Sequence, residues 1–281
     1  MTPVRVGAVG YLNARPLVYG LERNPRFDVR FDLPARCAQL LHVGETDLGL
    51  IPSIEFLRGP DGPESYRIVP ELAITSRGPV ESVALFTTRD VRDIRSIALD
   101  TSSRTSVALT RVVCARVFNI SPSFEEHGPD LAQMLSRADA ALIIGDKALF
   151  LDGGPLTLGQ GAEARAVMVE KIDLGELWLR TTGLPFVYAF WAGRPGVVGP
   201  EDVRALIDTR NASLMRTREI GRLYFPDDPA RQAIAERYLQ VNIKYVLGPD
   251  ERAGLERFYH YAAEAGAVPR AAAPTFFETR G

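Results

Sequence analysis

Short apolar runs alternate with amphipathic segments along most of the chain. The apolar runs have the length of strands and lie at residues 5–9, 27–31, 48–51, 68–74, 83–87, 96–99, 140–144 and 187–191. Helical periodicity marks the segments between them at 14–22, 34–43, 105–118 and 130–138. In 34–43, for example, Cys37, Leu40 and Leu41 fall at i, i+3 and i+4 and form one apolar stripe. Strands and helices in alternation are typical of α/β architecture.

The organisation of the chain indicates two lobes. After residue 191 the pattern becomes mostly helical, with expected helices at 201–224, 229–240 and 249–265 that carry charged outer faces. If the strands 83–87 and 187–191 both cross between lobes, residues 1–88 and 190–281 form the first lobe, and residues 89–189 form an inserted second lobe. This is the plan of a periplasmic-binding-protein-like fold, with a two-strand hinge and a ligand cleft between the lobes.

Charge and hydropathy exclude several kinds of partner. The chain holds 33 basic and 35 acidic residues, a net charge of −2, so nothing favours a nucleic acid. A small anion remains possible, because local donors and helix ends bind anions whatever the net charge. No apolar run approaches the ~20 residues that span a bilayer, and no secretory leader follows Met1. We therefore expect a cytoplasmic protein without membrane contact.

Several catalytic arrangements are absent. His42, His127 and His260 are scattered, without Cys or carboxylate partners at metal spacing. The chain has neither a G-x-S-x-G nucleophile elbow nor a dinucleotide-binding G-x-G-x-x-G. We expect no metal and no cofactor, and we expect Cys37 and Cys114 to be buried apolar residues. The remaining candidates are hydroxyls and amides, which suit binding better than strong acid–base chemistry.

Three strand ends in the first part of the chain carry polar side chains. Asn13 follows the first strand, where it is either the N-cap of the next helix or an amide that faces the cleft. Ser53 follows the third strand and is first interpreted as an N-cap, which could still border the cleft. Ser82 begins the strand 83–87 and would lie on the cleft floor if that strand is a hinge.

The segment 99–107 is the richest in hydroxyl groups. It places Ser102, Arg104, Thr105 and Ser106 between a strand and a strong helix. Free N–H groups at a helix start, with hydroxyls and a guanidinium beside them, form an anion site. The alternative is a helix cap with extra hydroxyls. The segment is not a phosphate-binding P-loop, because the glycines and lysine of that motif are missing.

In the segment 142–148, Gly145 and Asp146 lie between the end of a strand and the start of a short helix. A glycine here allows the backbone to approach a ligand closely. Asp146 either caps the short helix, the interpretation we favour, or orients a group in the cleft.

Six segments together resemble one family, the menaquinone-biosynthesis chorismate dehydratases, which have a type II periplasmic-binding-protein-like fold. The matching stretches are GYLNARPL at 10–17, DLGLIPSIEF at 47–56, GPVESVALF at 78–86, TSSRTSVAL at 101–109, IIGDKAL at 143–149 and DLGELWLRTTGLPFVYAFWAG at 173–193. The related dihydroxynaphthoate synthases of the same pathway carry a Ser-Pro-Cys-Pro-Asn-Asp motif after an early strand, which this chain lacks.

The resemblance implies a carbon–oxygen lyase that converts chorismate to 3-[(1-carboxyvinyl)oxy]benzoate by loss of water. By match to the family motif, Asn13 binds the departing hydroxyl and Ser82 positions the substrate. No protein base faces this chemistry, so we expect the enolpyruvyl carboxylate of the substrate to remove the ring proton. The other residues that the resemblance places at the substrate are Ser102, Arg104, Thr105 and Ser106 on a carboxylate, and Tyr11, Ser53, Gly145 and Asp146 along the cleft.

Two other functions stay open at this point. The same two lobes could form a cytoplasmic binding protein for a small carboxylate, because fold alone does not set function. The sister enzyme, 1,4-dihydroxy-6-naphthoate synthase, is the other alternative.

Overall fold

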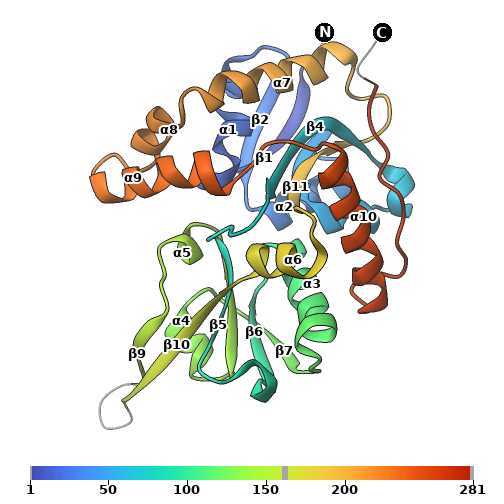
Figure 1. Ribbon diagram of the computed structural model, residues 1–281. Helices are drawn as coiled ribbons and strands as arrows, with labels where there is room; N and C mark the ends of the chain where they lie inside the picture. Colours follow the sequence, from blue (N-terminus) through green and yellow to red (C-terminus); the bar gives the residue numbers. More distant parts are fainter. Residues whose placement is uncertain (1, 160–163, 279–281) are drawn as a thin grey trace.

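The computed structural model describes residues 2–159 and 164–278 and contains two mixed β-sheets with helices packed around them (Figure 1). The first sheet has the strand order β2-β1-β3-β11-β4. Strands β1, β2 and β3 are parallel, whereas β11 runs antiparallel to both β3 and β4. The bounds are β1 Val4–Val9, β2 Phe27–Asp32, β3 Leu48–Pro52, β4 Arg67–Ser76 and β11 Phe186–Gly193.

The second sheet has the order β7-β6-β8-β5-β10-β9 and lies below the first in Figure 1. Strand β6 is parallel to β7 and β8, and β5 pairs antiparallel with β8 and β10. The bounds are β5 Val83–Thr87, β6 Ser96–Asp100, β7 Ser123–His127, β8 Ala140–Ile144, β9 Gly154–Leu158 and β10 Arg165–Asp173.

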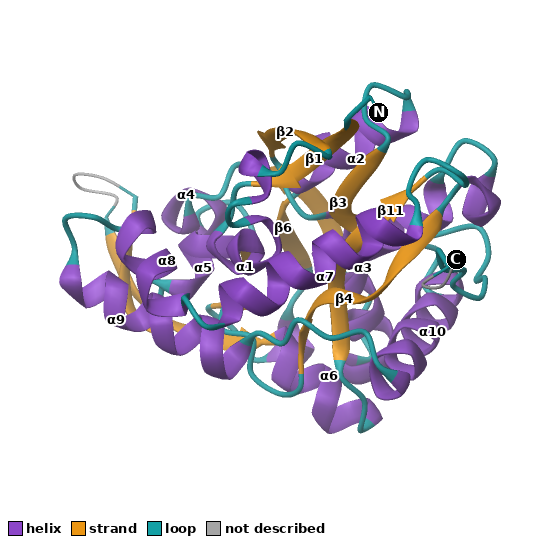
Figure 2. Ribbon diagram, turned by 90° about the horizontal axis from the view of Figure 1, so that it is seen from above, coloured by secondary structure: helices purple, strands orange, loops and turns teal. Residues whose placement is uncertain are grey.

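The helices divide between the two sheets. Figure 2 shows α7 running across the first sheet, with α8 and α9 following it at one end and α10 at the other. The helices with the first sheet are α1 Arg15–Val18, α2 Pro34–His42, α7 Pro200–Leu214, α8 Thr217–Tyr224, α9 Pro229–Arg237 and α10 Pro249–Glu264. Those with the second sheet are α3 Arg104–Val113, α4 Leu131–Leu135, α5 Gly145–Leu149 and α6 Leu174–Thr182.

The chain crosses between the sheets twice. It leaves the first sheet after β4 and enters the second at β5, and it returns through α6 to β11. We refer to the first sheet with its helices as lobe 1 and to the second as lobe 2. The division at residues 1–88, 89–189 and 190–281 stays a prediction.

Each strand expected from the sequence is present within two residues of its expected ends, but three others were not expected. These are β7, β9 and β10, whose residues are mostly exposed or half-buried. The expected helix 14–22 is wrong in length. Helix α1 ends at Val18, because the following Gly20 adopts a left-handed conformation with φ 81°. The expected helix 201–224 is two helices, separated at Met215 and Arg216.

Cys37 and Cys114 are buried and free, as expected. Within the described ranges, none of the helices is both long and apolar enough to cross a membrane. The cytoplasmic location stays a prediction.

Candidate functional site

A pocket of about 500 Å³, including its open mouth, lies between the two lobes. The ends of β1, β3 and β8 and the start of α3 meet there, so loops at the carboxyl ends of strands form much of the wall. The lining residues are Val9, Tyr11, Asn13, Pro34, Pro52, Ile74, Tyr188 and Ala189 from lobe 1, and Val80, Ser82, Val83, Ser103, Ser106, Ile144 and Gly145 from lobe 2 and the crossover before it.

The polar groups of this pocket are hydroxyls and one carboxamide. Among the described residues that line it, none is Asp, Glu, His, Lys or Arg. The polar lining residues are Tyr11, Asn13, Ser82, Ser103, Ser106 and Tyr188. In residues 2–159 and 164–278, moreover, no group of three or more His, Cys, Asp or Glu side chains is placed to bind a metal ion. The pocket therefore offers hydrogen bonds to a ligand rather than a charged acid or base.

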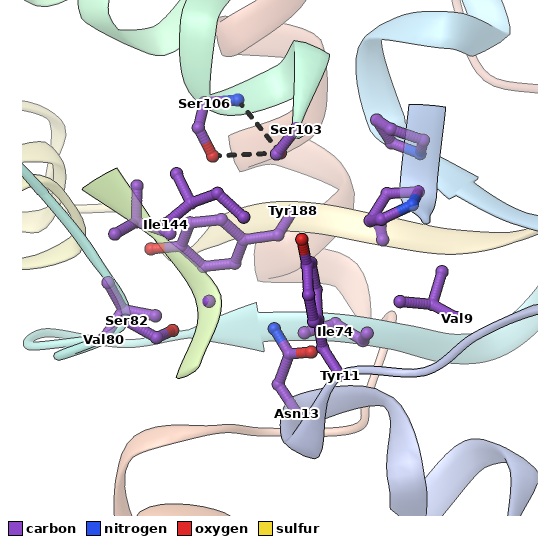
Figure 3. Close-up of a pocket in the computed structure, with 15 residues that line it drawn as sticks. Val9, Tyr11, Asn13, Ile74, Val80, Ser82, Ser103, Ser106, Ile144 and Tyr188 are labelled. Atoms are coloured by element: carbon purple, nitrogen blue, oxygen red, sulfur yellow. Dashed lines mark hydrogen bonds between the residues drawn. The ribbon is translucent and has the colours of Figure 1, made fainter. Parts of the chain in front are cut away.

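Asn13 points its side-chain amide into the pocket (Figure 3). It lies in the 3₁₀ turn Leu12–Ala14, and its backbone oxygen accepts a hydrogen bond of 2.9 Å from the Tyr245 hydroxyl. Its Oδ1 atom is buried and has no hydrogen-bond partner among the described residues. A buried carboxamide oxygen without a partner is costly. The N-cap alternative is wrong, because Ala14 occupies the N-cap position of α1 and no side chain caps that helix.

Ser82 lies on the floor of the pocket with only 1% of its surface exposed. The hydroxyl of Tyr238 donates to Ser82 Oγ at 2.6 Å. Because Tyr238 is buried, its pKa is well above the usual value, so this hydroxyl keeps its proton. The bond occupies one lone pair of Ser82 and leaves the serine proton available to a group in the pocket.

The start of α3 forms the wall opposite Asn13 (Figure 3). Ser103 is the N-cap, and its side chain accepts the backbone N–H of Ser106 at 3.4 Å. The two hydroxyl oxygens lie 3.0 Å apart, and both side chains line the pocket. The start of this helix presents backbone N–H groups and two hydroxyls to a ligand, an arrangement that favours an anion. Ser103 is not among the site residues expected from the sequence. The spacing of two serines three residues apart, Ser103 at the N-cap and Ser106 at N3, is the signal that indicates it.

The other expected residues of this segment lie around the pocket rather than in its lining. Ser102 donates to Asp100 Oδ1 at 2.6 Å. The Arg104 guanidinium contacts Glu55, with 2.7 Å between Nη1 and Oε2. Thr105 is fully buried, and its hydroxyl accepts the backbone N–H of Ile54 at 3.2 Å.

Ser53 joins the lobes behind the pocket. Its hydroxyl donates to the Val187 carbonyl at 2.8 Å and lies 3.3 Å from Thr105 Oγ1. The expected N-cap role is wrong, because Pro52 holds that position and no side chain caps the turn. Ser53 is fully buried, and its hydroxyl bonds across the sheet rather than to its own turn.

Glu55 is a buried centre of charge that the sequence did not indicate. It is fully buried and accepts hydrogen bonds from His42 at 3.0 Å, Arg58 at 2.9 Å and Arg104 at 2.7 Å. Burial acts to raise the pKa of Glu55, but the His42 hydrogen bond and the charges of Arg104 and Arg58 outweigh it and hold this pKa below its usual value. Arg104 belongs to lobe 2 and the other three residues to lobe 1, so this ion pair also joins the lobes.

Gly145 and Asp146 lie on the other side of the pocket. Gly145 has φ 67°, and a Cβ added there would lie 3.5 Å from the Tyr11 ring. Asp146 does not line the pocket: its carboxylate accepts the backbone N–H of Leu12 at 3.2 Å and the Tyr224 hydroxyl. Burial raises the pKa of Asp146. The expected capping role is wrong, because Ile144 holds the N-cap position of α5 without a side-chain cap.

Comparison with known proteins identifies the family. A family model described as "Menaquinone biosynthesis" matches residues 4–264. This chain belongs to the menaquinone biosynthesis family. A chorismate dehydratase of Thermus thermophilus is 33% identical over 283 residues, which cover 99% of both chains. The resemblance stated from the sequence is therefore confirmed.

Solved structures support the fold of this family member. An ABC transporter protein from Parabacteroides distasonis aligns over 100% of both chains with a TM-score of 0.61 and 14% identity. The alkanesulfonate-binding protein SsuA from Xanthomonas axonopodis pv. citri, bound to MOPS, aligns over 97% of this chain and 96% of its own, with a TM-score of 0.58 and 17% identity. The aliphatic sulphonate-binding protein SsuA from Escherichia coli covers 100% and 95%, with a TM-score of 0.59 and 16% identity. The fold is type II periplasmic-binding-protein-like, as expected.

The six stretches that carry the family resemblance converge on the pocket. Each of them contributes at least one lining residue, from Tyr11 and Asn13 in the first to Tyr188 and Ala189 in the last. Of the lining residues, only Val9, Pro34 and Ile74 lie outside these stretches. The pocket is thus where the family motifs meet.

Proposed function

We propose that this chain is a chorismate dehydratase, a carbon–oxygen lyase that eliminates water from chorismate to give 3-[(1-carboxyvinyl)oxy]benzoate. The observation that carries the proposal is that all six family stretches meet in one uncharged, hydrogen-bonding pocket. The full-length similarity to a chorismate dehydratase supports it.

The residue types in the pocket suit this elimination. One ring C–H bond and the neighbouring C–O bond break, the ring becomes aromatic, and the proton and hydroxide leave as water. Because aromatisation supplies a large driving force, the site needs no strong base. It needs to hold two carboxylates, fix the reactive conformer and stabilise the departing hydroxyl.

We assign the catalytic roles to Asn13 and Ser82. The amide of Asn13 faces the pocket with an unsatisfied oxygen, so it can accept from or donate to the departing hydroxyl. Ser82 is fixed by Tyr238 and can donate its proton to the substrate.

One substrate carboxylate binds at the start of α3, where Ser106 and Ser103 line the pocket. Tyr11 and Gly145 form the adjacent wall. The residues beside this lining support it from outside: Ser53, Ser102, Arg104, Thr105 and Asp146.

The enolpyruvyl carboxylate of the substrate is the proton acceptor in this proposal. Among the described lining residues there is no carboxylate or imidazole that could take the proton. Complete loss of activity in Asp146→Asn, with chorismate still bound and with Asn13 and Ser82 intact, would count against a substrate-assisted step.

The test is to mix the purified protein with chorismate and to follow an aromatic product lighter by one water by mass spectrometry. We expect wild type and Asn24→Ala, a matched asparagine change in a turn outside the pocket lining, to form product. Asn13→Ala should lose at least about a hundredfold in kcat and remain folded by circular dichroism. Chorismate binding without turnover would point instead to a binding protein, and turnover of cyclic futalosine alone would point to the sister enzyme.

A further inference from the structure

Asp146 makes a contact between the lobes beside Asn13. It lies in α5 of lobe 2, yet its Oδ1 accepts the backbone N–H of Leu12 in lobe 1 at 3.2 Å. Its other oxygen accepts the hydroxyl of Tyr224, from α8 of lobe 1. Leu12 immediately precedes Asn13. A carboxylate of one lobe therefore holds the backbone of the turn that carries the proposed catalytic amide of the other.

The turn from Gly10 to Asn13 is held at its backbone from both lobes. Asp146 accepts the Leu12 amide, and Tyr245 donates to the Asn13 carbonyl at 2.9 Å. The Tyr224 hydroxyl, whose proton goes to Asp146, lies 3.2 Å from the Gly10 carbonyl oxygen. Both tyrosines belong to lobe 1, as the turn does. Only the Asp146 contact depends on how the lobes sit relative to each other.

Hydrogen-bond donors and one cation surround the Asp146 carboxylate. Burial of an ionised carboxylate is costly unless donors and a nearby cation compensate for it. Burial raises the pKa of Asp146, and the hydrogen bonds from Tyr224 and Leu12 and the charge of Arg15 oppose this rise. The Arg15 guanidinium lies over the Tyr224 ring, 5.1 Å from its centroid, and over the Phe31 ring at 5.4 Å. This cluster is complete only with the lobes together, because Asp146 comes from lobe 2 and the others from lobe 1.

We propose that Asp146 is a positioning residue that couples lobe closure to catalysis: when the lobes close, it fixes the Leu12 amide and thereby places the Asn13 amide against the departing hydroxyl. This inference rests on the proposed function. Asp146 lies outside the pocket lining and acts through Leu12 and Asn13, not on the substrate. Tyr224 orients the carboxylate for this contact.

Three variants separate a positioning role from direct chemistry. Asp146→Ala removes the acceptor, Asp146→Asn keeps one amide oxygen for Leu12, and Tyr224→Phe removes the orienting hydroxyl. We expect kcat to fall by about tenfold to a hundredfold in Asp146→Ala, with a smaller change in KM, because a misplacement of about 1 Å has effects of this size. Asp146→Asn should recover part of the lost kcat, and Tyr224→Phe should lose about tenfold.

A second measurement reports on the contact between Asp146 and the Leu12 amide without any substrate present. Amide hydrogen exchange, measured by mass spectrometry on a peptide that covers residues 10–17, should be faster in Asp146→Ala than in wild type, because the Leu12 amide loses its acceptor. The matched control is Asp139→Asn. Asp139 also accepts two backbone amides, from Arg95 at 2.9 Å and Ser96 at 3.2 Å, but within lobe 2. This control should leave kcat, KM and exchange at 10–17 unchanged.

The outcomes are distinct. An Asp146→Ala variant with wild-type kcat, or with unchanged exchange at residues 10–17, overturns the inference. Equal inactivity of Asp146→Asn and Asp146→Ala, with Tyr224→Phe fully active, also overturns it and makes Asp146 a direct participant. If wild type forms no product from chorismate, the proposed function fails, and the exchange comparison alone then decides whether Asp146 anchors the turn.

Discussion

Glu55 and Arg104 form an ion pair between the lobes, with 2.7 Å between the carboxylate and the guanidinium. Arg104 is the first residue of α3, so the pair fixes the helix start that presents Ser103 and Ser106 to the pocket. Asp146 makes the reciprocal contact, from lobe 2 to the Leu12 amide of lobe 1. Each lobe thus contributes one carboxylate, Glu55 fully buried and Asp146 half-buried, that holds a pocket-forming segment of the other.

Glu55→Gln should destabilise the protein by about 3 kcal/mol, because His42, Arg58 and Arg104 lose the buried negative charge that they surround. Urea unfolding at neutral pH measures this change. Glu64→Gln is the control: the Glu64–Arg270 pair is exposed, with 68% and 70% of the two side chains accessible, and its loss should change stability little. Equal effects of the two substitutions would contradict the central role of Glu55.

Removal of the hydroxyl in Ser106→Ala should raise KM for chorismate by about tenfold, because a hydrogen bond to a charged group is lost. Ser103→Ala should do the same and also lower stability by about 1 kcal/mol, because Ser103 caps α3. Ser103→Gly separates the two effects, since glycine at an N-cap costs only a few tenths of a kcal/mol. The control Ser136→Ala removes a hydroxyl bonded to Ala132 at the end of α4 and should leave KM unchanged. Unchanged KM in both Ser106→Ala and Ser103→Gly would argue against carboxylate binding at this helix start.

Gly145→Ala tests the contact between the lobes at Tyr11. The backbone at Gly145 has φ 67°, which costs an alanine about 1 kcal/mol. The new methyl group would lie 3.5 Å from the Tyr11 ring, an ordinary contact, so we expect strain rather than a clash. Gly266→Ala is a matched control, because Gly266 has φ 68° and open space around it. Thermal unfolding should show similar losses for both variants, whereas chorismate turnover should fall only in Gly145→Ala. If turnover fell in both variants, the loss would come from backbone strain in general and not from a change at the pocket.

The parts of the fold that the sequence predicts are those with a local signal. The strands Val83–Thr87 and Ala140–Ile144 have their expected bounds because all of their residues are buried and apolar runs mark them directly. Strand β10 has an apolar run of four residues, 166–169, which is mostly exposed or half-buried and ends at Glu170 and Lys171, and pairing with β5 and β9 stabilises the strand. Pairing with distant strands leaves no trace in a short window of sequence.

The same limit applies to the site. The polar strand ends at Asn13, Ser82 and Gly145 were predicted because their positions after or before strands are local properties. Which of two adjacent serines faces the pocket depends on where α3 begins, so the sequence indicates Ser102, whereas Ser103 is the one that lines the pocket. The contact of Asp146 with Leu12 joins residues 134 positions apart, and no spacing rule indicates it.

Asp146 should also give the protein a defined dependence on pH. Burial raises its pKa above the usual 3.8, so between that value and the raised pKa the folded protein binds more protons than the unfolded chain. Stability from this group is therefore present below about pH 3.8 and is lost as pH rises through the raised pKa. Glu55 has the opposite sign, because its lowered pKa makes stability fall as pH drops below its usual 4.5.

The comparison of wild type with Asp146→Asn isolates the first effect, since both proteins keep Glu55. The free energy of unfolding of wild type minus that of Asp146→Asn should decrease as pH rises from about 3.8 and become constant above the raised pKa. Urea unfolding at a series of pH values measures this difference. A difference that grows with pH would mean that the donors Leu12 and Tyr224 stabilise the ionised form more than burial opposes it, and that the carboxylate holds the turn as an anion throughout the acidic range.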